Sequence, residues 1–308
     1  MKRLPLVPLV LLVIAVFVAA RYVPHFFDAR YLLDTSTLYI EVGLLALGST
    51  LVIVTGNIDL SVGSNLVLSA CLTAMLMRSG YGTFAAVTFS CVVGTVLGAI
   101  NGLMVAKLRL PSFLVTLGTM AAYRGAAQAA MGAKSIALPD GFKGIDQSLV
   151  FGVPWPLVIF LAIAVVSGVL LHRTVFGRWA FALGTNESAS QYSGLPNDWT
   201  KIAVFAYTGL MAGIGALLMD SRLAVARHDL ARGIELDAIT VAVVGGAAIT
   251  GGKGSILGTA IALFLLMTVR TAMGVANVKA EYQLTAIGAL LVVTVLASEF
   301  RRKSAADE

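Results

Sequence analysis

The chain has 308 residues, of which 58% are hydrophobic and 12% are charged, with a formal net charge of +6. Its apolar blocks run for roughly 15–24 residues without strand-like alternation, which excludes a soluble domain and a β-barrel and predicts membrane-spanning helices. The basic residues are scattered through short loops and form no aromatic-lined patch, which excludes a nucleic-acid partner. We therefore expect an all-α protein embedded in the lipid bilayer.

We expect about ten transmembrane helices, over the ranges Leu4–Ala20, Leu38–Val54, Ser61–Met77, Thr83–Ala106, Phe113–Met131, Pro154–Leu171, Ile202–Met219, Leu236–Thr250, Ser255–Val275 and Leu284–Ala297. The segment Leu236–Thr250 is short and ends in glycines, so we expect it to be broken or only partly inserted. An even number of spans puts both termini on one side. The basic clusters at Lys2-Arg3 and Arg301-Arg302-Lys303 predict that this side is cytoplasmic. Residues 1–308 then form a single transmembrane domain.

Small residues repeat at helical spacing in two of these spans. Gly94, Gly98 and Gly102 lie on one face of the fourth span, and Gly209 and Gly213 lie on one face of the seventh. Glycines four residues apart let two helix backbones approach closely in lipid. The spacing predicts tight helix–helix packing.

Polar residues interrupt the apolar sequence between the second and third spans. The segment Gly56–Gly63 contains Asn57, Asp59 and Ser61 with almost no loop around them. A carboxylate at membrane depth costs roughly 3 kcal/mol and needs partners. Asp59 could cap the helix that begins near Ser61. Two interpretations stay open: a tight capped turn, and the structural joint of a broken helix beside a translocation pathway.

Further polar residues fall within or at the edges of spans and extend this candidate pathway: Asn65, Asn101, Arg124 and Gln128, with Glu41 and Arg270 at span ends. Gly233–Asp237 echoes the spacing of Ile58–Ser61 on the opposite side of the membrane. Such an echo is typical of an inverted repeat, here of spans 2–5 and 7–10. We find no catalytic constellation, metal-ligand cluster or cofactor motif, and the glycine-rich stretch Gly245–Ser255 lacks the residues of a phosphate loop.

The connection at residues 172–201 is predicted to be cytoplasmic and to contain a short helix. Thr185 or Asn186 can cap this helix, Glu187 suits its first turn, and Gly194 with Pro196 ends it. A helix this short is marginal in water on its own, so we expect a partner to dock on it.

In this order and spacing, several motifs make the chain resemble the permease subunits of bacterial ABC importers of the ribose/rhamnose/autoinducer-2 group. The motifs are Gly56–Gly63, Asn101-Gly102, Pro111–Thr119, Gly177–Gly194, Glu235–Ile239, Gly245-Gly246 and Gly251–Gly254. The family more often has glycine at the position of Asn57, so the turn at that point is less permissive in this chain.

The resemblance implies a non-enzymatic, multi-pass subunit of the bacterial inner membrane that pairs with a second permease, as a homodimer or heterodimer. A separate cytoplasmic ABC ATPase dimer drives transport, and a periplasmic sugar-binding protein delivers a monosaccharide or related polyol, with a rhamnose-type solute favoured. The family's coupling helix maps onto Thr185–Gly194, within a cytoplasmic coupling loop at 172–201, and the expected ATPase-coupling residues are Arg178, Thr185, Asn186, Glu187, Ala189 and Gly194.

Three arginines cluster on the predicted outer face, at Arg222, Arg227 and Arg232. This runs against the positive-inside tendency, so we hypothesise that they dock acidic groups of the binding protein. The main alternative function is an ion-coupled secondary transporter, which would want paired carboxylates deep in the spans. A passive channel and an intramembrane enzyme are further alternatives with less support from the residues.

Overall fold

The computed structural model describes residues 6–23, 26–132, 134–142, 148–279, 281–290, 292 and 294. It is 76% helical with almost no sheet, which confirms the all-α prediction. In the described ranges the only strands are four two-residue segments, β1 (Ile136–Ala137), β2 (Leu149–Val150), β3 (Val153–Pro154) and β4 (Val225–Ala226). β1 pairs antiparallel with β4, and β2 pairs antiparallel with β3.

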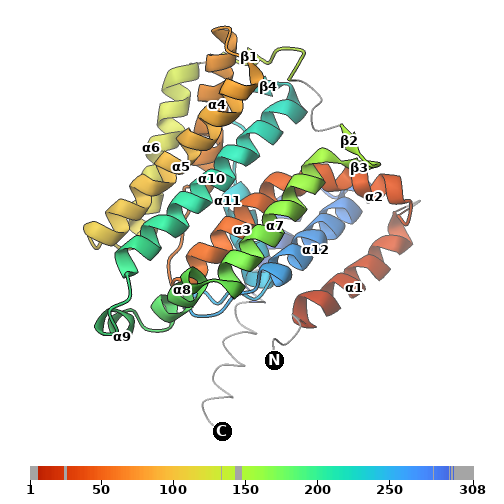
Figure 1. The fold of residues 1–308 in the computed structure, drawn as a ribbon. Helices are drawn as coiled ribbons and strands as arrows, with labels where there is room; N and C mark the ends of the chain where they lie inside the picture. Colours follow the sequence, from red (N-terminus) through yellow and green to blue (C-terminus); the bar gives the residue numbers. More distant parts are fainter. Residues whose placement is uncertain are drawn as a thin grey trace.

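Most of the helices run the length of one elongated bundle (Figure 1). They are α1 (Leu6–Tyr22), α2 (Ala29–Ser36), the short 3-10 helix η1 (Thr37–Tyr39), α3 (Ile40–Val54), α4 (Val62–Arg78), α5 (Thr83–Lys107), α6 (Ser112–Met131), α7 (Trp155–Arg173), α8 (Val175–Thr185), α9 (Glu187–Tyr192), α10 (Asn197–Leu223), α11 (Ile234–Val244) and α12 (Ile256–Val275). Residues 281–290 are also helical. We call the bundle end that carries α8 and α9 the α9 end, and the opposite end the β1 end.

Five helical segments in the described part of the chain are long and apolar enough to cross a membrane: Ala29–Val54, Thr83–Lys107, Trp155–Arg173, Asn197–Leu223 and Ile256–Val275. Val7–Tyr22 and Val62–Arg78 are shorter apolar helices. The expected count of about ten spans is therefore not confirmed. Most of Leu284–Ala297 and the basic clusters at both termini lie outside the described residues.

Helix α11 accounts for part of this difference. It has 11 residues, so at 1.5 Å per residue it covers about 16 Å. The hydrocarbon core is about 30 Å thick, so a helix of this length crosses roughly half of it. The expectation of a short, partly inserted segment near Leu236 agrees with this length.

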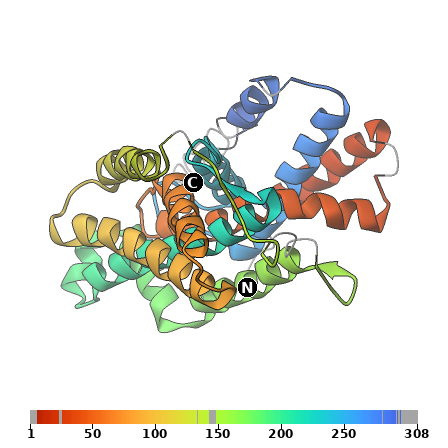
Figure 2. The same ribbon diagram turned by 90° about the horizontal axis from the view of Figure 1, so that it is seen from above.

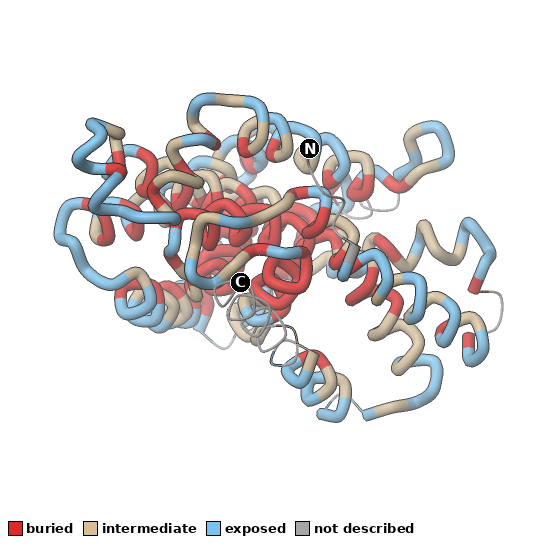
Figure 3. Tube along the Cα trace, turned by 90° about the horizontal axis from the view of Figure 1, so that it is seen from below, coloured by how far each residue is buried: buried red, intermediate tan, exposed pale blue. Residues whose placement is uncertain are grey.

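Helix α3 forms the centre of the bundle. Every one of its 15 residues is buried, because it packs against α10, α11, α12 and α7. Figure 3 shows the buried centre and the exposed outer helices, and Figure 2 shows the arrangement of the helices from above. A helix that is apolar on nearly all sides, with Glu41 as its one charged residue, is stable where other helices surround it.

Helices α5 and α10 meet along the glycine faces that the sequence predicts. A Cβ atom added at Gly94 would lie 2.8 Å from the backbone nitrogen of Gly213, and one at Gly98 would lie 3.0 Å from the Cα of Gly209. Ser90 Oγ donates to the carbonyl of Gly213 at 2.8 Å across the same contact. The predicted tight packing of these helices is confirmed.

Candidate functional site: the polar joint and the α8–α9 segment

The chain between α3 and α4 folds as a buried polar joint, residues 55–61. Gly56 adopts a φ of +76° just after α3 ends, a backbone conformation that glycine reaches without strain. Asp59 Oδ1 accepts hydrogen bonds from Ser61 N at 2.9 Å and Ser61 Oγ at 2.7 Å. Asp59 thus bonds to the residue at the helix start rather than capping a later amide as the sequence suggested.

Helices α5 and α6 complete the network around this joint. Asn101 Nδ2 donates to Ser61 Oγ at 2.7 Å. The Tyr123 hydroxyl donates to Asn101 Oδ1 at 3.2 Å and to the Leu97 carbonyl at 2.9 Å. Asn101 is fully buried. A buried polar network that satisfies its own groups holds its helices in one arrangement.

Two more candidate pathway residues are also satisfied within the protein. Asn57 Nδ2 donates to Thr55 at 3.1 Å, and Asn65 Nδ2 donates to the Gly94 carbonyl at 3.0 Å. Both residues are buried. These hydrogen bonds give Asn57 and Asn65, like Asp59, Ser61 and Asn101, a structural role, which agrees equally with a tight turn and with a joint beside a pathway.

The remaining two candidates, on α6, behave differently. Arg124 is half-buried and donates from Nη1 to the Leu230 carbonyl at 2.7 Å and to the His228 carbonyl at 3.4 Å. It therefore ties α6 to the loop that leads into α11. Gln128, one turn further along α6, is exposed.

The entry to α11 mirrors the joint in several respects. Gly233 has a φ of +82°, as Gly56 has +76°, and each precedes an acidic residue by two or three positions. The Glu235 side chain lies against the first turn of α4, where a Cβ at Gly63 would overlap its Oε2 atom. The two polar segments thus meet inside the bundle.

Two ion pairs of the bundle were not predicted from the sequence. Glu41 Oε1 accepts from Arg222 Nη2 at 2.9 Å and Nε at 3.1 Å, and Arg270 Nη2 donates to both Asp237 oxygens at 2.7 and 2.8 Å. Both carboxylates are almost fully buried. An unpaired charge in lipid is costly, so the sequence indicated that these residues need partners. It did not indicate which charges would pair.

The predicted short helix at the α9 end is confirmed as α9. Asn186 is its cap, because its Oδ1 accepts from Ala189 N at 2.9 Å. The other proposed cap, Thr185, closes α8 instead and donates to the Phe181 carbonyl at 2.8 Å. Gly194, with a φ of +76°, ends the turn that follows.

Helix α9 is fixed to the start of α10 by polar contacts. Lys201 Nζ donates to Glu187 Oε1 at 2.6 Å. Asn197 accepts from Ser190 Oγ at 2.6 Å and donates to the Glu187 carbonyl at 3.1 Å. Glu187, expected to contact an ATPase, is thus engaged within the chain. Ala189 stays exposed, and the exposed side of α9 also carries Tyr192, which is 93% exposed.

A polar groove of about 1050 Å³ opens beside α9. The α5–α6 connection, the joint and α9 supply its walls, which include Asn57, Lys107, Arg109, Glu187 and Lys201. Lys107 and Asp198 form an exposed ion pair at 2.8 Å within it. Arg178 lies on α8, where it contacts the Thr174 carbonyl at 3.4 Å.

The three arginines predicted for docking lie near the β1 end in different environments. Arg222 is paired with Glu41 inside the protein. Arg227 forms an exposed ion pair with Asp229, and this hydrogen bond holds the pKa of the Asp229 carboxyl below its usual range. Arg232 is exposed, and none of the salt bridges among described residues involves it.

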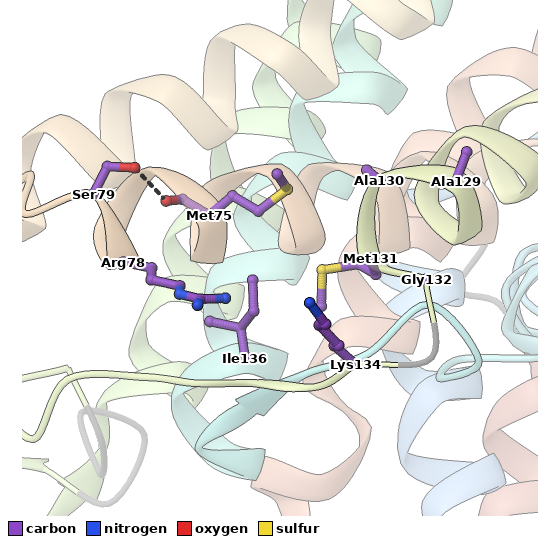
Figure 4. Close-up of a pocket in the computed structure, with 9 residues that line it drawn as sticks. All are labelled: Met75, Arg78, Ser79, Ala129, Ala130, Met131, Gly132, Lys134 and Ile136. Atoms are coloured by element: carbon purple, nitrogen blue, oxygen red, sulfur yellow. Dashed lines mark hydrogen bonds between the residues drawn. The ribbon is translucent and has the colours of Figure 1, made fainter.

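A hollow of about 580 Å³ near the same end carries two further cations. Arg78 at the end of α4 and Lys134 after α6 both reach into it, next to Ile136 (Figure 4). Within the described part of the chain no salt bridge involves either side chain. Sequence reasoning counted these residues only as loop charges.

A bundle of apolar helices with a closed polar joint and a capped helix at one end defines a multi-span membrane permease. The chain belongs to the family described as "branched-chain amino acid transport system / permease component", whose model matches residues 31–295. No solved structure matches the chain.

Three relatives match nearly the whole length. The autoinducer 2 import system permease protein LsrD of Enterobacter sp. (strain 638) is 34% identical over 295 residues, covering 94% of this chain and 90% of its own. The ribose import permease protein RbsC of Haemophilus influenzae is 32% identical over 294 residues (94% and 91%), and that of Bacillus subtilis is 34% identical over 301 residues (97% and 93%). These relatives give no support to the rhamnose-type solute that the sequence resemblance favoured.

Proposed function

We propose that this chain is the membrane-spanning subunit of an ATP-driven importer for a monosaccharide or related small polyol. The observation that carries the proposal is α9, a capped helix held on the bundle end by Lys201 and Asn197 with its outer side exposed. The likeness to ribose and autoinducer-2 import permeases supports the same function. The protein then resides in the bacterial inner membrane, with the α9 end and both termini in the cytoplasm.

A separate ABC ATPase dimer docks on the coupling loop, residues 172–201. The internal bonds of Asn186 and Glu187 give these two residues the role of holding α9 in position. Direct contact then falls to the exposed side of the helix, with Ala189 at its centre and the Tyr192 ring as the largest apolar group offered. Exposed aromatic residues of this kind are enriched among the anchors of protein interfaces.

A periplasmic binding protein delivers the solute at the β1 end. Because Arg222 and Arg227 are engaged in ion pairs, we assign the docking charge to Arg232 together with Arg78 and Lys134. A second permease, identical or different, completes the channel. Gly56 and Gly233 both have a positive φ and both precede an acidic residue, which supports an inverted repeat. In this repeat the joint and α11 correspond to each other and lie at its centre.

Reconstitution tests this function. The permease is co-expressed with a candidate ABC ATPase and a candidate sugar-binding protein from the same organism, and uptake of labelled ribose, autoinducer-2 and rhamnose is measured in vesicles. We expect uptake that requires ATP and the binding protein, with ribose or autoinducer-2 preferred. Uptake that follows an imposed proton or sodium gradient without ATP would refute the proposal.

The ion-coupled alternative has less support from the buried carboxylates. Glu41 and Asp237 are paired with arginines, and Asp59 is bonded to Ser61. No described residue forms a hydrogen bond with the buried Asp220 carboxylate in α10. Replacing Asp220 with Asn leaves ATP-dependent uptake unchanged if the importer function is right, whereas an ion-coupled carrier that used this group would lose uptake.

A further inference from the structure

Three turns from distant parts of the chain meet at the α9 end. The first is Gly56, which follows α3; the second is Gly184, in the last turn of α8; and the third is Gly251-Gly252, between α11 and α12. The sequence marks the third only as a glycine-rich stretch that does not bind nucleotide. We call this meeting point the glycine junction.

The contacts in the glycine junction are made by backbone atoms. Gly252 N donates to the Val54 carbonyl at 2.9 Å. A Cβ at Gly184 would overlap that same carbonyl oxygen and lie 2.6 Å from Gly252 N. A Cβ at Gly251 would lie 2.9 Å from the Cα of Gly56. Backbone atoms of helix ends cannot yield as a flexible side chain does, so Gly184 and Gly251 have room for glycine only, whereas Gly56 is favoured by its φ of +76°.

The turn at Gly252 also touches the segment that leads directly into α9. A Cβ at Gly252 would lie 2.6 Å from Thr185 Oγ1 and 3.2 Å from the Thr185 Cα. Thr185 is followed at once by Asn186, the cap of α9. The hydroxyls of Thr50 in α3 and Thr259 in α12 are hydrogen-bonded at 2.8 Å deeper in the bundle. The ends of α3, α8 and α12 are thus held as one body close to α9.

Two of the three turns of the glycine junction open into elements that carry buried polar groups. The chain runs from Gly56 into the joint with Asp59 and Ser61. From Gly251-Gly252 it runs back into α11, which begins with Glu235 and Asp237, and forward into α12 with Arg270. A displacement of α8 would therefore reach both the joint and α11 through the glycine junction.

Resting on the proposed function, we infer that Gly56, Gly184 and Gly251-Gly252 are positioning residues that transmit the movement of the docked α9 to the joint and to α11. The glycine junction moves as a unit during the transport cycle. Its glycines let three backbones touch with no side chain between them, so little of the displacement of α9 is lost before it reaches the solute path.

The first experiment separates transport from ATP hydrolysis. In Gly184→Ala the added methyl group pushes the end of α8 away from Val54 and Gly252, while α9 and its outer surface stay unchanged. We expect the assembled complex to retain binding-protein-dependent ATP hydrolysis and to lose about tenfold or more of its uptake, within the range of typical coupling between sites. Gly168→Ala in α7, whose Cβ would meet only Ile256 Cγ2 at 3.9 Å, is the matched control and should keep both activities.

The second experiment needs no destabilising substitution. Thr185→Cys and Lys253→Cys, both at exposed positions, are introduced where Cys71 and Cys91, the free cysteines of the described chain, are replaced by Ala. A short bis-maleimide then links the two turns permanently. The reference is the Thr185→Cys single variant treated with the same reagent, so that any effect of the modification on the coupling loop is present in both samples. If the junction moves as a unit, the linked permease transports at the rate of this reference.

Loss of uptake on cross-linking, with the single-cysteine controls active, would show that the two turns separate during transport and would overturn the inference. Normal uptake by an assembled Gly184→Ala complex would also overturn it. If the Gly184→Ala variant is not produced as folded protein, the cross-linking experiment alone tests the inference. A failure of the proposed function is seen separately, as a wild-type complex without ATP-dependent uptake.

Discussion

Two glycine-lined contacts organise this bundle, and they differ in kind. Along α5 and α10, glycines spaced by four residues let two straight helices touch over several turns. In the glycine junction, glycines from three separate turns touch at single points beside α9. A repeated contact between helices resists displacement as a whole, whereas a contact between turns passes displacement from one element to the next. The comparison assigns α5–α10 to the static frame and the junction to the moving part.

We expect the largest effect from adding a side chain to the α5–α10 contact. In Gly209→Val the new side chain would overlap the Gly94 carbonyl and press on the Cα of Gly98 at 3.0 Å. Overpacking of this kind typically costs about 1–3 kcal/mol and more where backbones touch. We expect little monodisperse permease after detergent extraction and a lowered melting temperature. Gly118→Val on α6, where nothing lies near the Cβ position, should behave as wild type, and an equal loss there would contradict the assignment.

The ion pair between Glu41 and Arg222 connects the two regions, because it joins α3 to α10. Removing one partner of a buried pair leaves the other charge uncompensated and costs about 3–5 kcal/mol. Glu41→Ala should therefore lower the thermal stability of the purified permease strongly. The double variant Glu41→Ala with Arg222→Met should recover most of the loss, and no recovery would mean that the pair is not the cause.

A smaller effect is expected at α9 itself. Asn186→Ala removes the cap, which is worth about 1 kcal/mol of helix stability. The melting temperature of the bundle should hardly change, while retention of the ATPase subunit on co-purification should fall several-fold. Asn186→Ser, which keeps a capping oxygen, should restore retention. Weak retention in both variants would point to a direct contact by Asn186 instead.

The smallest effect is expected at the β1 end, far from both glycine contacts. Replacing Arg232 and Lys134 with Ala should weaken docking of the binding protein, since exposed charges mainly steer association. The loss should be several-fold at low salt and should disappear at high salt, where charges more than roughly 3–8 Å apart are screened. Docking is measured by surface plasmon resonance. If the variant bound the binding protein with the same salt dependence as the wild type, these cations would not be part of the interface.

Regular features of the fold could be predicted from the sequence. The glycine spacing in α5 and α10 predicted that each packs closely on another helix, and the pattern of Thr185 or Asn186 as cap, Glu187 in the first turn and Gly194 at the end predicted the short helix α9. Both patterns are local, because a few neighbouring residues determine a helix face or a helix cap.

Features that depend on distant partners could not be predicted. Asn101 meets Ser61 across 40 positions, and Arg222 meets Glu41 across 181. The glycine junction joins turns at Gly56, Gly184 and Gly252, and although the sequence marks each of them within a motif, it does not indicate that the three meet. Five long apolar helices are found among the described residues, and the count of about ten spans is not confirmed, because helices such as α11 fall short of the bilayer thickness.

The most direct measurement concerns α9. Residues 186–193 are replaced by a glycine–serine chain of equal length, with Lys201→Met so that no cation is left buried without Glu187. ATPase retention and ATP-dependent uptake are measured together in vesicles against the wild type. We expect the permease to insert and remain folded, to lose the ATPase subunit on co-purification and to lose uptake. A permease that still retains the ATPase and transports would contradict the coupling role of α9.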